Sequence, residues 1–152
     1  MQYQIQKLDG SDISLIQQLL ILFKRVFDEG DINISDLPDK RYLESLLVKN
    51  GFCAFVALAD DKVVGGLTAY ELDMYMEKGK EAYLYDLAVD ENYRRQGIAR
   101  LLLTKLQKYA KENGISTIFV EAHVEDTGAI DFYKSMNAVM EEVCHFNIIM
   151  RQ

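Results

Sequence analysis

The chain has 152 residues, of which 49% are hydrophobic and 27% charged, and this composition excludes a disordered chain and predicts one globular domain. Its 24 acidic and 17 basic residues give a net charge of −7. A protein that binds nucleic acid normally carries the opposite sign, so we expect no nucleic-acid partner.

Membrane insertion and export are not expected either. No apolar run approaches the roughly 20 residues that a membrane-spanning helix needs. The first seven residues are mostly polar and contain no apolar segment of a secretory signal. Cys53 and Cys144 lie in apolar, strand-like runs, which predicts two buried thiols in a reducing cytoplasm.

The first third of the chain predicts two amphipathic helices. Apolar residues recur every three or four positions over residues 13–27, and Ser11 or Asp12 can cap the first turn. A second helical pattern covers about 39–48. The loop between these helices is acidic, and its carboxylates are Asp28, Glu29, Asp31, Asp36 and Asp39.

The rest of the chain alternates strands and helices. The predicted strands cover 52–59, 62–72, 81–89, 116–124 and, as one bent strand or two, 138–150; the predicted helices cover 96–113 and 126–136. The strand–helix–strand order over 81–124 predicts a right-handed parallel crossover. We therefore expect a single α/β (α+β) domain over residues 1–152, with a mixed, mostly antiparallel sheet flanked by helices.

The turn after the central strand carries the most informative motif. A strand ending in Leu-Ala-Val is followed by a polar turn and then by the start of a helix, with Gly97 at its opening. The N-terminus of a helix offers unpaired N–H groups and a partial positive charge, and a glycine allows a phosphate to approach the backbone. Three arginines surround the opening: Arg94, Arg95 and Arg100. Alone, these features also fit an ordinary helix start.

With a second motif, the chain resembles the GCN5-related N-acetyltransferases. Arg94-x-x-Gly97-x-Ala99 is similar to the loop with which that family binds the pyrophosphate of acetyl-CoA. The run from Asp126 to Tyr133 (Asp-x-x-Ala-Ile-x-Phe-Tyr) is similar to a later helix of the family. The resemblance implies that acetyl-CoA or CoA is bound by Leu87, Ala88, Val89, Arg94, Arg95, Gln96, Gly97, Ile98, Ala99, Arg100, Asp126 and Ala129. No metal site is expected, because the cysteines and histidines of the chain lack a paired spacing such as Cys-x-x-Cys.

Within that family, the chain looks most like the aminoglycoside 3-N-acetyltransferases. The shared segments are Tyr-Asp-Leu-Ala-Val at 85–89, Arg-Arg-Gln-Gly-Ile-Ala at 94–99, Glu-Glu-Val at 141–143 and His-Phe at 145–146. His123 departs from the subgroup, which has an acid at that position, and a neutral imidazole would not hold an ammonium group directly.

The resemblance implies direct transfer of an acetyl group to an amine. Asp86, in the central strand, is the expected base that takes the proton from the amine. Placing a carboxylate in so apolar a strand costs free energy, which a catalytic role would explain. Hydrogen bonds from neighbouring backbone N–H groups would also explain it. Tyr133 is the expected acid that protonates the departing thiolate, against the alternative of a tyrosine that only packs on the core.

Other acids and one histidine are expected on the acceptor side of the site. Glu121 and His123 alternate on the predicted strand after the helix and can face the same side as Asp86, and Glu81 is a weaker candidate. Together with the acidic loop, they would attract a small cationic amine. Family members commonly dimerise, so the resemblance also implies a homodimer.

Three functions are compatible with the sequence. The first is a cytoplasmic acetyltransferase for a small polycationic amine such as an aminoglycoside. The second has the same chemistry and acts on a polyamine, a peptide N-terminus or a lysine. The third is a CoA-binding regulatory domain without turnover, which the loop around Gly97 fits equally well, so Asp86 and Tyr133 are what favour an enzyme.

Overall fold

The structure, a computed structural model, describes residues 2–27, 30 and 32–151. They form two compact units, one that ends at Glu121 and one that begins at Ala122. The strands of the first unit are β1 (Gln4–Lys7), β2 (Phe52–Ala59), β3 (Lys62–Asp73), β4 (Lys80–Val89) and β5 (Ile115–Val120). Its helices are α1 (Ile13–Val26), α2 (Lys40–Leu47) and α3 (Ile98–Glu112), with short 3-10 turns η1 (Ile34–Asp36) and η2 (Glu91–Tyr93).

The strands form one five-stranded sheet in the order β1-β2-β3-β4-β5. Three neighbouring pairs are antiparallel, and β4 and β5 are parallel. The chain passes from β4 to β5 through α3, which confirms the predicted mixed sheet and its parallel crossover. Strand β1 was not predicted, because its sequence Gln-Ile-Gln-Lys contains one apolar residue and lacks a strand signal of its own.

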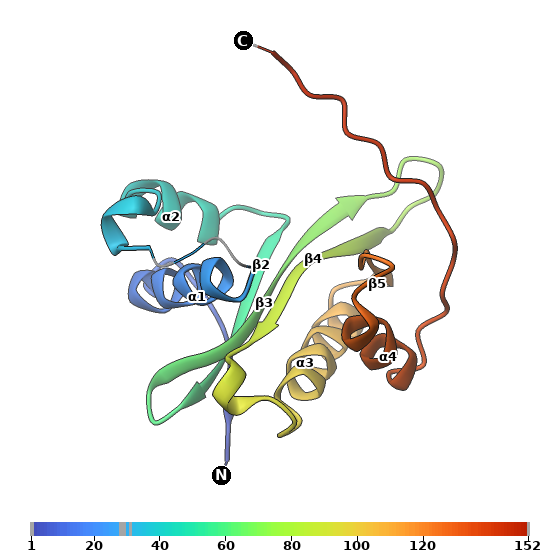
Figure 1. Cartoon of the computed structure of the whole chain (residues 1–152). Helices are drawn as coiled ribbons and strands as arrows, with labels where there is room; N and C mark the ends of the chain where they lie inside the picture. Colours follow the sequence, from blue (N-terminus) through green and yellow to red (C-terminus); the bar gives the residue numbers. More distant parts are fainter. Residues whose placement is uncertain (1, 28–29, 31, 152) are drawn as a thin grey trace. The chain divides into compact units, whose positions relative to one another are not determined.

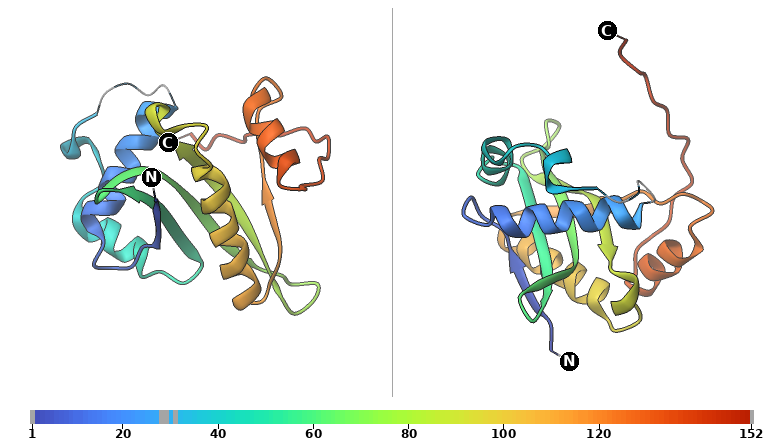
Figure 2. Two further views of the ribbon diagram at one scale, coloured as in Figure 1. Left: turned by 90° about the horizontal axis from the view of Figure 1, so that it is seen from below. Right: turned by 60° about the vertical axis from the view of Figure 1, so that its left-hand side comes forward.

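Helices cover both faces of this sheet. Helices α1 and α2 lie on one face and α3 lies on the other (Figure 1). Figure 2 shows α1 running across the strands. Two adjacent glycines of β3 allow this close packing: a Cβ on Gly65 would lie 3.0 Å from Ile98 of α3, and one on Gly66 would collide with Leu19 of α1. The apolar stripes of α1 and α3 are therefore held on opposite sides of the same point of β3.

Strand β4 contains an irregularity beside the central aspartate. Asp86 pairs with Thr68 of β3, whereas Leu84 pairs with the next residue, Ala69. Tyr85 is thus the extra residue of a β-bulge, which interrupts the strict alternation of side chains. As a result Tyr83, Tyr85 and Asp86 all belong to the face that carries α1 and α2.

The second unit contains one helix, α4 (Thr127–Ser135). The strands predicted over 138–150 are wrong: residues 138–151 form no helix or strand, and their large apolar side chains are exposed. An apolar run predicts a strand, but a strand forms only where another strand accepts its backbone hydrogen bonds. The prediction of a buried Cys144 fails for the same reason, since its thiol is exposed, whereas Cys53 in β2 is buried as expected.

None of the helices among the described residues combines the length and the hydropathy that crossing a bilayer requires.

Candidate functional site

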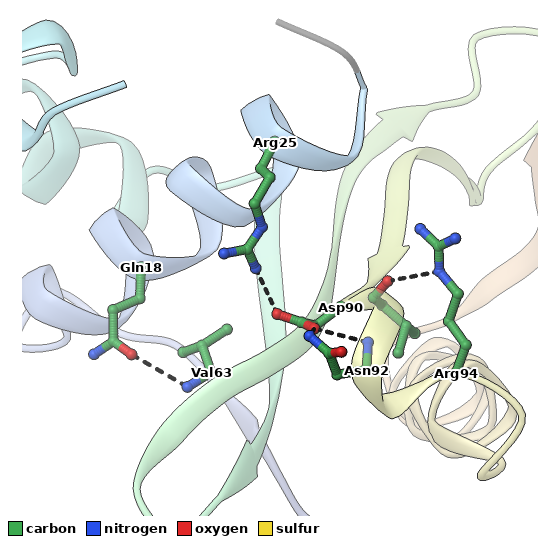
Figure 3. Close-up of polar contacts among 7 residues, drawn as sticks. Gln18, Arg25, Val63, Asp90, Asn92 and Arg94 are labelled. Atoms are coloured by element: carbon green, nitrogen blue, oxygen red, sulfur yellow. Dashed lines mark hydrogen bonds and ion pairs between the residues drawn. The ribbon is translucent and has the colours of Figure 1, made fainter. Parts of the chain in front are cut away.

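The turn that follows β4 is fixed by a buried carboxylate. The side chain of Asp90 is only 6% exposed and forms an ion pair with Arg25 near the end of α1. Its other carboxylate oxygen accepts a hydrogen bond of 3.0 Å from the backbone N–H of Asn92 (Figure 3). The backbone N–H of Asp90 donates to the carbonyl of Val64 in β3. One residue therefore joins the turn to α1 and to the sheet.

Gly97 opens α3 in the left-handed region, with φ of +81°, and acts as its N-cap. A glycine adopts this conformation without strain, whereas a side chain would disfavour it. A Cβ placed on Gly97 would meet no atom within 4 Å, so the space beside this backbone is open. Gly97 has no side chain to cap the helix, and the first N–H groups of α3 have no partner within the helix. This geometry fits an anion such as a pyrophosphate.

Cationic and amide side chains surround this opening. Arg94, Arg95 and Arg100 are exposed. The Nε–H of Arg94 donates to the carbonyl of Val89 at 3.2 Å, which directs its guanidinium along the end of β4 (Figure 3). The hydroxyl of Tyr3, just before β1, donates to the side-chain oxygen of Gln96. Ile98 is buried and anchors the first turn of α3.

The end of β4 has a strand partner on one edge only. Pairing with β5 stops at Leu84 and Val120, whereas pairing with β3 continues to Val89. Among the described residues, the segment 86–89 therefore pairs with β3 alone. Backbone groups on such an edge can bind an extended, amide-containing ligand as a further strand would. Leu87, Ala88 and Val89, which the resemblance implies as coenzyme-binding residues, lie in this segment.

Asp86 is half-buried in the bulge of β4. Tyrosines surround it: its negative charge contributes to raising the pKa of Tyr70, for which burial is the largest cause. The same holds for Tyr83, whose pKa is raised first by burial and then by the charge of Glu121. Asp86 thus belongs to a group of acids and phenols on the face that carries α1 and α2.

Two expected acceptor-side acids belong to the same unit. Glu81 lies two residues before Tyr83 on β4, on the same face of the strand. Glu121 follows directly after β5 and accepts a hydrogen bond from Tyr83. The predicted strand over 116–124 is too long, because β5 ends at Val120 and a turn begins at His123, whose carbonyl accepts from the N–H of Asp126. The expected alternation of Glu121 and His123 is therefore wrong.

The remaining predicted residues lie in the second unit. The side chain of Asp126 caps α4 and accepts a hydrogen bond of 2.9 Å from the N–H of Ala129. This pairing gives the Asp-x-x-Ala motif a structural role in starting the helix. Tyr133, on α4, is half-buried and packs against the ring of Phe132. His123 is exposed.

The acidic loop between α1 and α2 is described only in part. Asp28, Glu29 and Asp31 lie outside the described residues. Asp36 and Asp39 act as caps: the carboxylate of Asp36 accepts from the N–H of Asn33, and that of Asp39 accepts from the N–H of Tyr42 at 2.8 Å. These hydrogen bonds give a structural role to two carboxylates that were expected to attract the cationic acceptor.

Metal-ligand groupings and cavities were sought among the residues that the structure describes. Within 2–27, 30 and 32–151, no three His, Cys, Asp or Glu side chains are grouped as metal ligands. A recess of about 240 Å³ lies between the last turns of α3 and the start of β5, where Gln107, Lys111 and Ser116 line it. It contains none of the predicted site residues.

Sequence reasoning missed three residues that position the turn. These residues are Asp90, Arg25 and Tyr3, none of which belongs to the motifs described above. The contacts that matter, Arg25 with Asp90 and Tyr3 with Gln96, join residues 65 and 93 positions apart. The one available signal was the position of Asp90 directly before a short turn, which is typical of a cap.

Comparison with known proteins agrees with the fold. The family model described as acetyltransferase (GNAT) family matches residues 17–138. An aminoglycoside acetyltransferase from an uncultured soil metagenomic sample, solved in complex with sisomicin, is 39% identical, with a TM-score of 0.92 over 98% of this chain and 97% of that one. A second such enzyme from soil is 36% identical, with a TM-score of 0.93 over 99% of this chain and 100% of that one.

A human relative extends the comparison. N-acetyltransferase 8 from Homo sapiens is 32% identical over 126 residues, which cover 82% of this chain and 55% of the relative. The chain thus spans about half the length of the curated relatives it matches. Since the family model covers most of the chain, and similar solved acetyltransferases share its fold, this protein belongs to the acetyltransferase (GNAT) family.

Proposed function

We propose that this protein is an acetyl-CoA-dependent N-acetyltransferase that moves an acetyl group directly to a primary amine of a small polycationic acceptor. The proposal depends mainly on the turn between β4 and α3. Gly97, in the left-handed region, begins α3 there, and a Cβ on it would meet no atom within 4 Å. That backbone can accept the pyrophosphate of the coenzyme, and Arg94, Arg95 and Arg100 add positive charge.

The edge of β4 would hold the extended part of the coenzyme. Residues 86–89 pair with β3 alone among the described residues, and the amides of a pantetheine chain match such an edge. Backbone N–H groups of Leu87, Ala88 and Val89 would also stabilise the negative charge that develops on the acetyl oxygen. The coenzyme supplies the acetyl group as a thioester.

Asp86 would accept the proton from the acceptor amine, directly or through water. The C–N bond then forms as the C–S bond breaks, and the thiolate leaves. Tyr133 is proposed as the acid that protonates this thiolate, on the strength of the match at α4 alone. If Tyr133→Phe keeps full activity, this assignment is wrong.

The acceptor is proposed to be an aminoglycoside, acetylated at its 3-amino group. Support comes from the aminoglycoside acetyltransferases at 39% and 36% identity, one of them in complex with sisomicin. The acids near β4, Glu81, Asp86 and Glu121, suit an acceptor with several ammonium groups. The cytoplasmic location and a homodimer stay predictions.

Release of CoA thiol tests the proposal. The full chain is assayed with acetyl-CoA and a panel containing gentamicin, spermidine and a lysine peptide with a free N-terminus. We expect thiol release with gentamicin, and mass spectrometry should place one acetyl group on the 3-amino position. Thiol release with only spermidine or the peptide would show that the proposed acceptor is wrong, while the proposed acetyl transfer to an amine would still hold. Binding of CoA without release on any amine would leave a regulatory CoA-binding domain.

A further inference from the structure

Five aromatic rings form a continuous row across four strands of the sheet. Phe52 of β2 lies against Tyr70 of β3, with ring centroids 5.3 Å apart, and Tyr70 lies 5.7 Å from Tyr85 of β4. The row continues from Tyr85 to Tyr83 at 5.3 Å, and from Tyr83 to Phe119 of β5 at 4.8 Å. Such spacings are those of direct aromatic contact, so the rings support one another.

The bulge of β4 places this row beside the proposed base. Tyr83 and Tyr85 share a face by strand alternation, and the extra residue at the bulge brings Asp86 onto the same face. The pairing of Asp86 with Thr68, two residues before Tyr70 on β3, leads to the same conclusion. A regular strand would have turned Asp86 away from the tyrosines.

The rings are not fully covered. Tyr85 is 58% exposed and Tyr70 is 38% exposed, although both lie in the sheet. Tyr85 makes edge-to-face contacts with its two neighbours, at interplanar angles of 77° and 61°, and these contacts restrict the movement of its ring. Large apolar surface that is both exposed and rigid is typical of binding sites.

Charge and hydroxyl groups indicate what this surface would bind. Asp86 contributes negative charge near Tyr70 and Tyr83, and Glu121 does so near Tyr83. These charges raise the pKa of the phenols in addition to the effect of burial. The hydroxyls therefore stay protonated at neutral pH and can donate or accept hydrogen bonds. Aromatic faces next to carboxylates favour a cation with an apolar face.

We propose that Tyr70, Tyr83 and Tyr85 form a stacking surface for the ring of a cyclic polyamine, an aminocyclitol or amino sugar, and so select cyclic over linear acceptors. The C–H face of such a ring packs on the aromatic row while its ammonium groups reach the carboxylates. A rigid ring also loses less conformational freedom on binding than a linear polyamine does. This inference rests on the proposed function, because it assigns the acceptor side of the same site.

Calorimetric binding to the full chain with CoA present tests the inference without requiring turnover. The probes are gentamicin as the cyclic polyamine and spermidine as the linear one. We expect Tyr85→Leu to weaken gentamicin binding by about threefold to tenfold, the contribution of one aromatic contact, and to leave spermidine binding within about twofold. Tyr85→Phe keeps the ring and should bind gentamicin nearly as the unchanged protein does.

Tyr75→Leu is the matched control. Tyr75 lies between β3 and β4, is 94% exposed and is not part of the row, so its loss should change neither affinity. Equal weakening of gentamicin and spermidine by Tyr85→Leu would overturn the inference, and so would absence of gentamicin binding by a chain that still binds CoA. Ring-dependent binding of gentamicin without acetylation would support the inference while the proposed function fails.

Discussion

The guanidinium of Arg25, near the end of α1, lies 2.5 Å from the carboxylate of Asp90, at the end of β4. Asp90 is buried, and Arg25 is half-exposed. Through this pair, the helix on one face of the sheet holds the turn that leads to Gly97 and α3. The orientation of the proposed coenzyme-binding turn therefore depends on a residue 72 positions earlier in the chain.

Replacing Arg25 by alanine should loosen this turn. The buried carboxylate of Asp90 would keep its hydrogen bond from Asn92 but lose its cation, and we expect a loss of about 1–2 kcal/mol in the free energy of unfolding. Affinity for CoA should fall as well. Urea unfolding and calorimetric CoA titration measure the two effects.

Lys108→Ala is the control for the Arg25 variant. Lys108 and Glu112 form an exposed pair along α3 with an N–O distance of 3.9 Å, and such pairs stabilise a protein little. Its loss should change neither quantity measurably. An Arg25→Ala variant as stable as the Lys108→Ala variant would show that the ion pair does not hold the turn.

Substitution of the glycines at the two ends of α3 distinguishes the effect of backbone strain from the effect of ligand contact. Gly97 and Gly114 both have positive φ, +81° and +69°, and a Cβ on either would meet no atom within 4 Å. Either glycine-to-alanine change should cost about 1 kcal/mol of stability. Only Gly97→Ala should also weaken CoA binding, by roughly tenfold or more, because its methyl group would occupy the path of the phosphates. Equal CoA affinity of the two variants would remove Gly97 from the coenzyme site.

Asp86→Asn should lower kcat strongly, because an amide cannot take the proton of the amine. General-base catalysis typically contributes about 10²–10⁴-fold, and we expect a loss in that range. The KM for acetyl-CoA should stay within about twofold. Asp73→Asn, at the exposed end of β3, supplies a control with the same charge change. Unchanged turnover of Asp86→Asn would exclude Asp86 as the base.

Much of this site followed from local sequence patterns. The glycine at the start of α3 and the carboxylate in the central strand both stand out because each residue type is unusual at its place. The bulge at Tyr85 could not be predicted, since it depends on the register of β4 against β3. Dependence on a pairing partner also explains why β1 could not be predicted, since it forms a strand only by pairing with β2. It explains as well why the strands expected over 138–150 are wrong, because an apolar pattern does not show which strand would pair with the segment.

Burial was equally hard to predict for charged residues. Asp90 and Glu71 are acidic residues, a type that is mostly exposed in folded proteins, yet their side chains are only 6% and 8% exposed. Each is buried because cationic or hydroxyl groups from distant segments meet it. Composition records the charge of such residues but not the three-dimensional contacts that allow it to be covered.

Glu71 gives the fold a specific dependence on acid. Burial by itself would raise the pKa of Glu71, but hydrogen bonds from Tyr109 and Lys80 outweigh burial and hold it below its ordinary value of 4.5. The folded state therefore binds a proton here less readily than the unfolded chain. The stabilisation by Glu71 is fully present above pH 4.5 and is lost as the pH falls through the lowered pKa.

Urea unfolding between pH 3 and 7 checks this dependence. Glu71→Gln should be less stable than the unchanged protein at pH 7, and the difference should shrink as the pH falls below 4.5, because protonation removes the same charge. Tyr109→Phe deletes the hydrogen bond of 2.5 Å to Glu71. This variant should also be less stable than the unchanged protein at pH 7, and that difference in stability should also shrink as the pH falls. Glu112→Gln, an exposed acid of α3, should leave the pH profile unchanged. A gap between Glu71→Gln and the unchanged protein that stays constant from pH 7 to pH 3 would mean that Glu71 does not titrate below its ordinary range.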